Sequence, residues 1–235
     1  MILHCENYFT TIPQAVGTKT KIMKKIITSG NTFMLLGLAA IFAVSACSTT
    51  GMQRSEEVQS SMQTVDNDIK EIVVQIDAIN SSLDELTKPG QADLKRAFDL
   101  FSDNASEIKK METGFSKNSV RMEESGETYF EEWDKDNQKY DNPEIQKRSD
   151  ERREELGRTY DKIAQYNVGV KEAFVSYVSD INEIERFLSN DLTGDGIDSI
   201  TPISDKAMNN GSHLKSELQN LQSAIEEARL KMRQS

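Results

Sequence analysis

Cysteine and histidine are nearly absent from this chain of 235 residues, which contains two of each. From residue 47 onward only Cys47 and His213 remain. A disulfide, a zinc site or a histidine-based catalytic triad needs more of these side chains than this part of the chain supplies. We therefore predict no cofactor and no metal site, and we expect His213 to be a partly exposed helix residue.

Basic residues are scarce relative to acidic ones: 28 lysines and arginines stand against 39 aspartates and glutamates, a net charge of −11. Residues 1–46 hold four lysines and one glutamate, so the rest carries 24 basic and 38 acidic residues, a net charge of −14. Such a surface argues against nucleic acid as a partner and against electrostatic docking on anionic lipid heads. No spacing singles out an acid–base pair, and we predict that the protein is not an enzyme.

Proline is rare as well, with four residues, of which Pro89, Pro143 and Pro202 follow the N-terminal region. A proline inside a helix costs roughly 3 kcal/mol, so the long stretches without it favour helices, and we expect these three prolines at turns. At the second of these turns we expect Asn142 to be the N-cap and Pro143 the first residue of the next helix. The chain also has no useful run of alternating apolar and polar residues, which excludes a substantial sheet.

The sequence does have heptad repeats of apolar residues. In the stretch 53–87 the apolar positions are spaced alternately by four and three residues, as in a helix that packs along one seam. These positions are Val58, Met62, Val65, Ile69, Ile72, Ile76, Ile79, Leu83 and Leu86. Similar seams occur over 91–139 and 143–188, and a fourth runs from Ile203 to Met232.

Four seams with short breaks predict an all-α fold: an elongated antiparallel bundle of about four long helices over residues 53–235, with coiled-coil-like packing. The second and third helices are the longest, and we expect them to project as a hairpin. Glu112, Ser119 and Gly126 interrupt the second seam, and the small ones could admit bulky side chains from a facing helix. A polar loop over 189–201 precedes the last helix. A parallel self-coiled dimer would satisfy the same seams.

The N-terminal region has the order of features found in a secretion signal. Met23 is followed by two lysines and then by the apolar run 33–44, which is shorter than the about 20 residues of a membrane-spanning helix. The run ends in Val-Ser-Ala-Cys, which resembles the lipobox of bacterial lipoproteins and implies acylation, including palmitate, of Cys47. An ordinary signal peptide, or an uncleaved anchor that contains a cysteine, is the alternative.

This interpretation divides the N-terminal part of the chain. Residues 1–22 are predicted to be an extension from a mis-called start, 23–46 a lipoprotein signal peptide and 47–52 a lipidated tether. Ser48 stands where an aspartate would resemble the inner-membrane retention signal of enterobacterial lipoproteins. We therefore expect lipid attachment to the outer membrane, facing the periplasm, with the inner membrane as the alternative.

One segment has a partial resemblance to a calcium-binding loop. Asp191 and Asp195 occupy the first and fifth positions and Gly196 the sixth, where such a loop turns sharply. Thr193 replaces an acidic ligand, and Pro202 stands in place of the bidentate glutamate. We interpret the segment as a turn between helices and keep ligand or calcium binding as an alternative function.

Aromatic residues are densest between 129 and 140. At helical spacing Tyr129, Trp133 and Tyr140 lie near one side, and Phe130 is offset. Aromatic side chains of this kind are common in protein interfaces and also in the ends of helical bundles. We therefore name Tyr129, Trp133 and Tyr140 as a possible partner surface, with packing inside the bundle as the alternative.

Two groups of residues carry a resemblance to known sequences. They are Phe130, Glu131, Glu132, Trp133, Asp134, Tyr140, Asn142, Arg148, Ser149, Arg152 and Tyr160, and then Phe187, Leu188, Ser189, Asn190, Asp191, Leu192, Ile197, Ser199 and Ile200. On these residues the chain resembles an uncharacterised bacterial family of envelope lipoproteins, catalogued only as a domain of unknown function. The resemblance implies helices and an envelope location and supplies no catalytic residues. We expect a non-enzymatic interaction or structural protein with a protein partner in the envelope, or one that self-associates.

Overall fold

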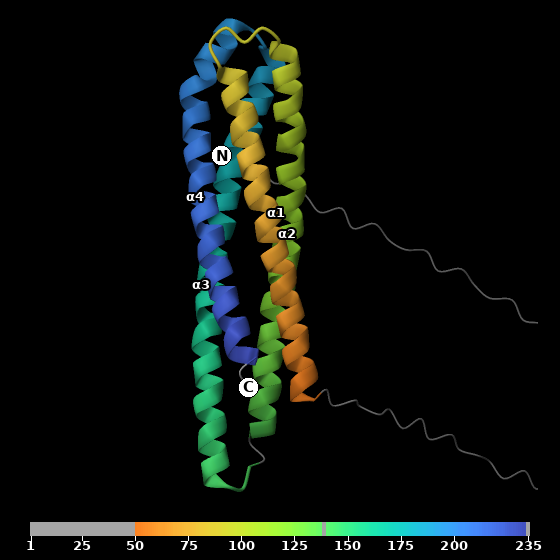
Figure 1. Cartoon of the computed structure of the whole chain (residues 1–235), viewed down its shortest axis with the longest axis vertical. Coiled ribbons are helices and arrows are strands. Elements are labelled where there is room, and N and C mark those ends of the chain that lie inside the picture. The colour runs from red at the N-terminus through yellow and green to blue at the C-terminus, as the bar shows by residue number, and fades with distance from the viewer. Residues whose placement is uncertain (1–49, 138–139, 234–235) are drawn as a thin grey trace, which may run out of the picture. The chain divides into compact units, whose positions relative to one another are not determined.

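The computed structural model describes residues 50–137 and 140–233, and these residues form four α-helices. The helices are α1 (Gly51–Thr87), α2 (Leu94–Asn137), α3 (Pro143–Asn190) and α4 (Gly194–Arg233). They run alternately up and down (Figure 1), and the described part of the chain contains no strand. The predicted all-α antiparallel bundle is therefore confirmed.

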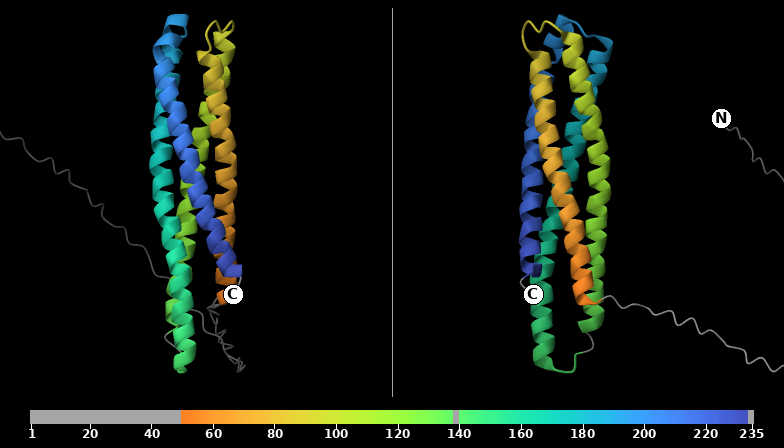
Figure 2. Two further views of the ribbon diagram at one scale, coloured as in Figure 1. Left: turned by 60° about the vertical axis from the view of Figure 1, so that its left-hand side comes forward. Right: turned by 45° about the vertical axis from the view of Figure 1, so that its right-hand side comes forward.

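The core of the bundle follows the predicted seams closely. Every residue of the α1 seam is at most 1% exposed. Helix α1 packs against α2 and α4, and α3 packs against the same two helices, so the four helices form a closed ring around one core. Figure 2 shows this arrangement from two further sides. Because the seams face one another within a single chain, burial of their side chains is satisfied without a second copy.

Small residues in the seams receive large aromatic ones, as the sequence suggested for the second seam. A Cβ atom built on Gly126 would lie 2.0 Å from Cε1 of Tyr160, and one on Gly211 would lie 2.9 Å from Cε2 of Tyr177. Tyr177 is completely buried, and its hydroxyl lies 3.2 Å from Oδ1 of Asn80 on α1. Gly211 thus allows the ring of Tyr177 to reach across the core to α1, and Gly126 allows the ring of Tyr160 to pack closely on α2.

The two short connections lie at one end of the bundle (Figure 1). Between α1 and α2 the chain turns at Gly90, which has φ = 75°, a conformation that costs glycine nothing. Between α3 and α4 only residues 191–193 separate the helices, so the predicted loop over 189–201 is wrong. Thr193 makes the turn short, because its hydroxyl donates to Asp191 (2.7 Å) and accepts from the amide of Gly196 (3.1 Å).

The start of α4 also corrects two details. Pro202 lies inside α4 and not in a turn, on the exposed side of the helix. Its cost is offset by apolar neighbours, since Ile197 and Ile200 are buried against the core. Ile203, predicted as the first seam residue, is 47% exposed, and Ser204 takes the core position beside it.

Helices α2 and α3, of 44 and 48 residues, are the longest and form a hairpin that extends beyond the other two helices, as predicted (Figure 1). Asn142 caps α3, with its side chain accepting from the amides of Glu144 (2.9 Å) and Ile145 (3.4 Å), and Pro143 is the first helical residue. No helix among the described residues is long and apolar enough to cross a membrane.

Candidate functional site at the hairpin end

Helix α1 begins at the same end of the bundle as the α2–α3 hairpin. Thr50 and Gln53 form a capping box: the Thr50 hydroxyl accepts from the Gln53 amide (3.3 Å), and the Gln53 side chain accepts from the Thr50 amide (3.0 Å). Gly51 and Met52 belong to this helix, so a tether from Cys47 is shorter than predicted. Cys47 itself, like residues 1–46, lies outside the described residues, and its acylation stays a prediction.

Arg54 fixes the start of α1 against the end of α2. Its Nη2 lies 2.8 Å from Oδ2 of Asp136, and its Nη1 lies 3.7 Å from Oε2 of Glu132. The Arg54 side chain is 13% exposed, so these ion pairs are partly shielded from water. The first turn of α1 is therefore level with the last turn of α2.

Polar contacts join the two helices of the hairpin, α2 and α3. Trp133 Nε1 donates to Oγ of Ser149 at 2.9 Å, and Asn137 donates to Asp150 at 2.5 Å. Arg153 makes a two-point contact with Asp134, at 2.5 and 2.7 Å. These hydrogen bonds from Arg153 hold the pKa of the Asp134 carboxyl below its ordinary value.

The aromatic residues of the hairpin pack mainly on one another. The ring of Tyr129 lies 5.3 Å from that of Phe130 and 5.6 Å from that of Trp133, and Phe130 lies 5.4 Å from Tyr160, all edge to face. Burial raises the pKa of the Tyr160 hydroxyl. Tyr129 and Trp133 are partly buried by this packing, which uses much of the surface that the sequence offered to a partner.

Tyr140 does not belong to this cluster. Helix α2 ends at Asn137, so Tyr140 is not on the helix, and the expected common side with Tyr129 and Trp133 is wrong for this residue. Its side chain is 46% exposed. Ile145, two residues into α3 and 49% exposed, accompanies it at the tip. Ile145 was not predicted as a site residue, although an isolated apolar residue in a charged stretch was a usable signal.

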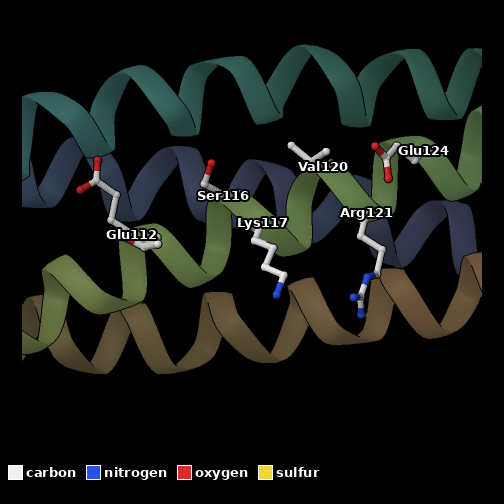
Figure 3. Close-up of a pocket in the computed structure, with 7 residues that line it drawn as sticks. Glu112, Ser116, Lys117, Val120, Arg121 and Glu124 are labelled. Atoms are coloured by element: carbon white, nitrogen blue, oxygen red, sulfur yellow. The ribbon is translucent and has the colours of Figure 1, made fainter. Parts of the chain in front are cut away.

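A shallow groove of about 630 Å³ runs along α2 (Figure 3). Glu112 and Ser116 point toward α3, whereas Lys117 and Arg121 point toward α1. Desolvation raises the pKa of the Glu112 carboxyl. The groups diverge along one helix and do not converge on a point where a substrate atom could sit, so the geometry offers no assembled acid–base pair.

The structure also places the predicted calcium and histidine candidates. Asp195 and Gly196 lie in the first turn of α4 and only residues 191–193 stay outside the helices, so the segment does not form the 12-residue loop of that calcium-binding motif. His213 lies exposed on α4, as expected. Within residues 50–137 and 140–233, no group of three or more histidine, cysteine, aspartate or glutamate side chains could hold a metal ion.

These observations define a class: an all-α, antiparallel four-helix bundle with one projecting hairpin. Within this class the chain belongs to the family described as a protein of unknown function (DUF2959), whose family model matches residues 45–234. No curated protein and no solved structure matches the chain.

Proposed function

We propose that this chain is a lipoprotein of the bacterial cell envelope, held at the outer membrane by acyl chains on Cys47 and facing the periplasm. In this proposal it has no enzymatic activity and acts as a tethered helical adaptor for another envelope protein. The Val-Ser-Ala-Cys sequence at Cys47 and the serine that follows it are the reasons for the anchor and for the outer membrane.

The observation that carries the proposal is the position of the first helix. The capped start of α1 lies four residues after Cys47, so an acyl chain there would hold a rigid bundle directly at a membrane surface. The family match begins two residues before this cysteine and therefore includes it. Several acyl chains anchor a protein stably where one binds only marginally, so the acidic bundle needs no electrostatic attraction to lipid.

Metabolic labelling with a palmitate analogue tests the anchor. We expect label on the wild type, none on Cys47→Ser, and unchanged labelling of Cys5→Ser, which serves as the matched control. Separation of inner and outer membranes on a density gradient then assigns the membrane. Label that persists in Cys47→Ser would refute the anchor.

Crosslinking in cells followed by pull-down tests the adaptor role. We expect one dominant envelope protein with the wild type and its loss with Cys47→Ser, because only the anchored chain is held near its partner. Recovery of the chain alone would contradict the adaptor and favour self-association. Saturable turnover by purified residues 47–235, abolished by changing one carboxylate, would contradict the absence of enzymatic activity.

A further inference from the structure

The tip of the hairpin lies beyond the start of α1. Arg54 is level with Asp136, and Asn137 bonds Asp150, so the first turns of α3 have no part of α1 beside them. From Pro143 to Asp150 the helix rises seven residues, which is about 10 Å at 1.5 Å per residue. Helix α4 ends even earlier, since Lys231 contacts Thr159 at 3.2 Å.

Ile145 is left about half exposed by this arrangement. It precedes Ser149 by four residues and therefore lies on the same face of α3, the face that meets Trp133 of α2. Helix α2 ends at Asn137, whose partner is Asp150, so Ile145 lies about one turn past the end of α2. Its exposure, with that of Tyr140, gives the tip one apolar and one amphipathic side chain that are each about half exposed.

The segment between Cys47 and α1 is long enough to span the distance by which the hairpin tip extends past the start of α1. Cys47 is four residues from Gly51, a distance of at most about 14 Å for an extended chain. This length exceeds the about 10 Å by which the tip passes α1. Acyl chains on Cys47 and the side chains at the tip can therefore meet the same plane while the bundle stands upright, with the 88–93 turn about 65 Å away from that plane.

The charge of the tip is compatible with lipid. Residues 140–148 contain two acidic and two basic side chains, so this segment is neutral on an acidic protein. Tyrosine favours the boundary between water and hydrocarbon, and Lys147 and Arg148 can lay their apolar stems against it while their charges stay in water. A protein partner at this position would have to fit between the tip and the anchoring membrane.

We propose that the hairpin tip is a membrane-contact site, in which Tyr140 and Ile145 enter the lipid head-group region of the membrane that holds Cys47. The inference rests on the lipid anchor proposed above. The hairpin is then a second point of membrane contact, in addition to the acyl chains. The opposite end, with the 88–93 and 191–193 turns, then faces away from the membrane and toward other envelope components.

The test uses the full lipidated chain, reconstituted into vesicles of phosphatidylethanolamine and phosphatidylglycerol. A fluorophore sensitive to polarity is attached to Ile145→Cys, with Val175→Cys and Ile203→Cys as matched controls at exposed positions along α3 and at the far end. Acylation blocks the Cys47 thiol, so each chain takes one label. Circular dichroism checks that the fold is unchanged, and palmitate-analogue labelling of the same preparation reports acylation separately.

We expect the label at position 145 to shift to shorter emission wavelength and to lose most of its emission to nitroxide-bearing lipids, while both controls behave as in water. Acylated protein with an aqueous label at 145 would overturn the contact site and leave the anchor standing. Equal quenching at 203 would show a bundle lying along the surface and would also overturn the proposal. Absence of acylation would overturn both proposals.

Discussion

The bundle has two ends that share one heptad repeat and fill it with different side chains. At the end with the two short turns, the core consists of large apolar residues, such as Leu83, Phe101 and Leu188, which are completely buried. Toward the hairpin, the same register passes through Ser119, Gly126 and other small or polar residues. The repeat therefore fixes the topology in both halves, while the side chains set how tightly each half is held.

Polar groups buried toward the hairpin reduce its stability further. Ser119 and Asn137 are buried toward the hairpin, and Oγ of the first and Oδ1 of the second have no hydrogen-bond partner among the described residues, whereas in the half with the two short turns this holds for Oγ of Ser204. A buried polar atom without a partner costs about 1–3 kcal/mol. We expect the hairpin half to open before the other half, which fits an end that contacts other molecules.

The largest expected effect is a cavity at the turn end. Phe101→Ala removes a completely buried ring and should lower the free energy of unfolding by about 3–5 kcal/mol. Leu100→Ala, at the neighbouring position that is 55% exposed, is the control and should change it by less than about 0.5 kcal/mol. Urea denaturation measures both variants. Similar decreases in the free energy of unfolding for the two variants would contradict the assignment of Phe101 to the packed core and Leu100 to the solvent-exposed side of α2.

The next effect comes from the glycine that admits Tyr160. In Gly126→Ala the new methyl group would meet the tyrosine ring, so we expect a loss of about 1–3 kcal/mol. Gly114→Ala, on the same helix with open space around the site, should instead stabilise by about 0.5–1 kcal/mol.

The double variant Gly126→Ala/Tyr160→Leu separates a local clash from a general effect on α2. It should recover part of the stability that Gly126→Ala loses, because the smaller side chain leaves space for the methyl group. Urea denaturation of the wild type, Gly126→Ala, Gly114→Ala and the double variant gives the comparison. No recovery in the double variant would show that the ring contact is not the cause.

Much of the fold could be predicted because heptads and caps are local signals. The α1 seam and the Asn142 cap follow from spacing and residue type alone. The start of α4 could not, because Pro202 is a helix breaker on local grounds and only burial of the preceding isoleucines outweighs it. The core position predicted for Ile203 was wrong because the helix begins before Pro202, so that Ile200 and Ser204 face the core instead.

The candidate site was less predictable than the fold. Sequence spacing assumed one continuous helix to Tyr140, whereas α2 ends at Asn137. Long-range contacts such as that between Arg54 and Asp136 carry no signal in a single sequence, since 82 residues separate the partners. Only the structure aligns the start of α1 with the hairpin and so shows that both lie at the same end of the bundle.

A smaller effect is expected from the cap of the hairpin. Asn142→Ala removes the oxygen that accepts from the Glu144 amide and should cost about 1 kcal/mol. Amide hydrogen exchange should accelerate in the first turn of α3 and stay unchanged around the 88–93 turn. Asn142→Asp keeps an acceptor and should behave like the wild type. Faster exchange at both ends would indicate that the two halves unfold as one unit.

The smallest effects concern two ion pairs, one in each half. Desolvation pushes the pKa of Glu185 upward, but hydrogen bonds from Lys109 and Ser102 outweigh it and leave this pKa below its ordinary value of 4.5. A depressed pKa stabilises the fold above pH 4.5 and stops doing so as the pH falls through the lowered value. Glu185→Gln should therefore cost roughly 1 kcal/mol at pH 6, and the difference from wild type should shrink toward pH 3.

Asp134 in the hairpin should contribute to the free energy of unfolding with the same pH dependence as Glu185, but by a smaller amount. Its pKa is lowered from 3.8 by Arg153, so its contribution is also present at pH 6 and lost on acidification. The Asp134 side chain is 48% exposed, however, against 19% for Glu185, and water screens its ion pair more strongly. We expect Asp134→Asn to cost less than about 0.5 kcal/mol at pH 6, measured by urea denaturation. A larger loss than for Glu185→Gln would mean that the hairpin depends on its charges more than the turn end does, and it would reverse the order of stability proposed for the two halves.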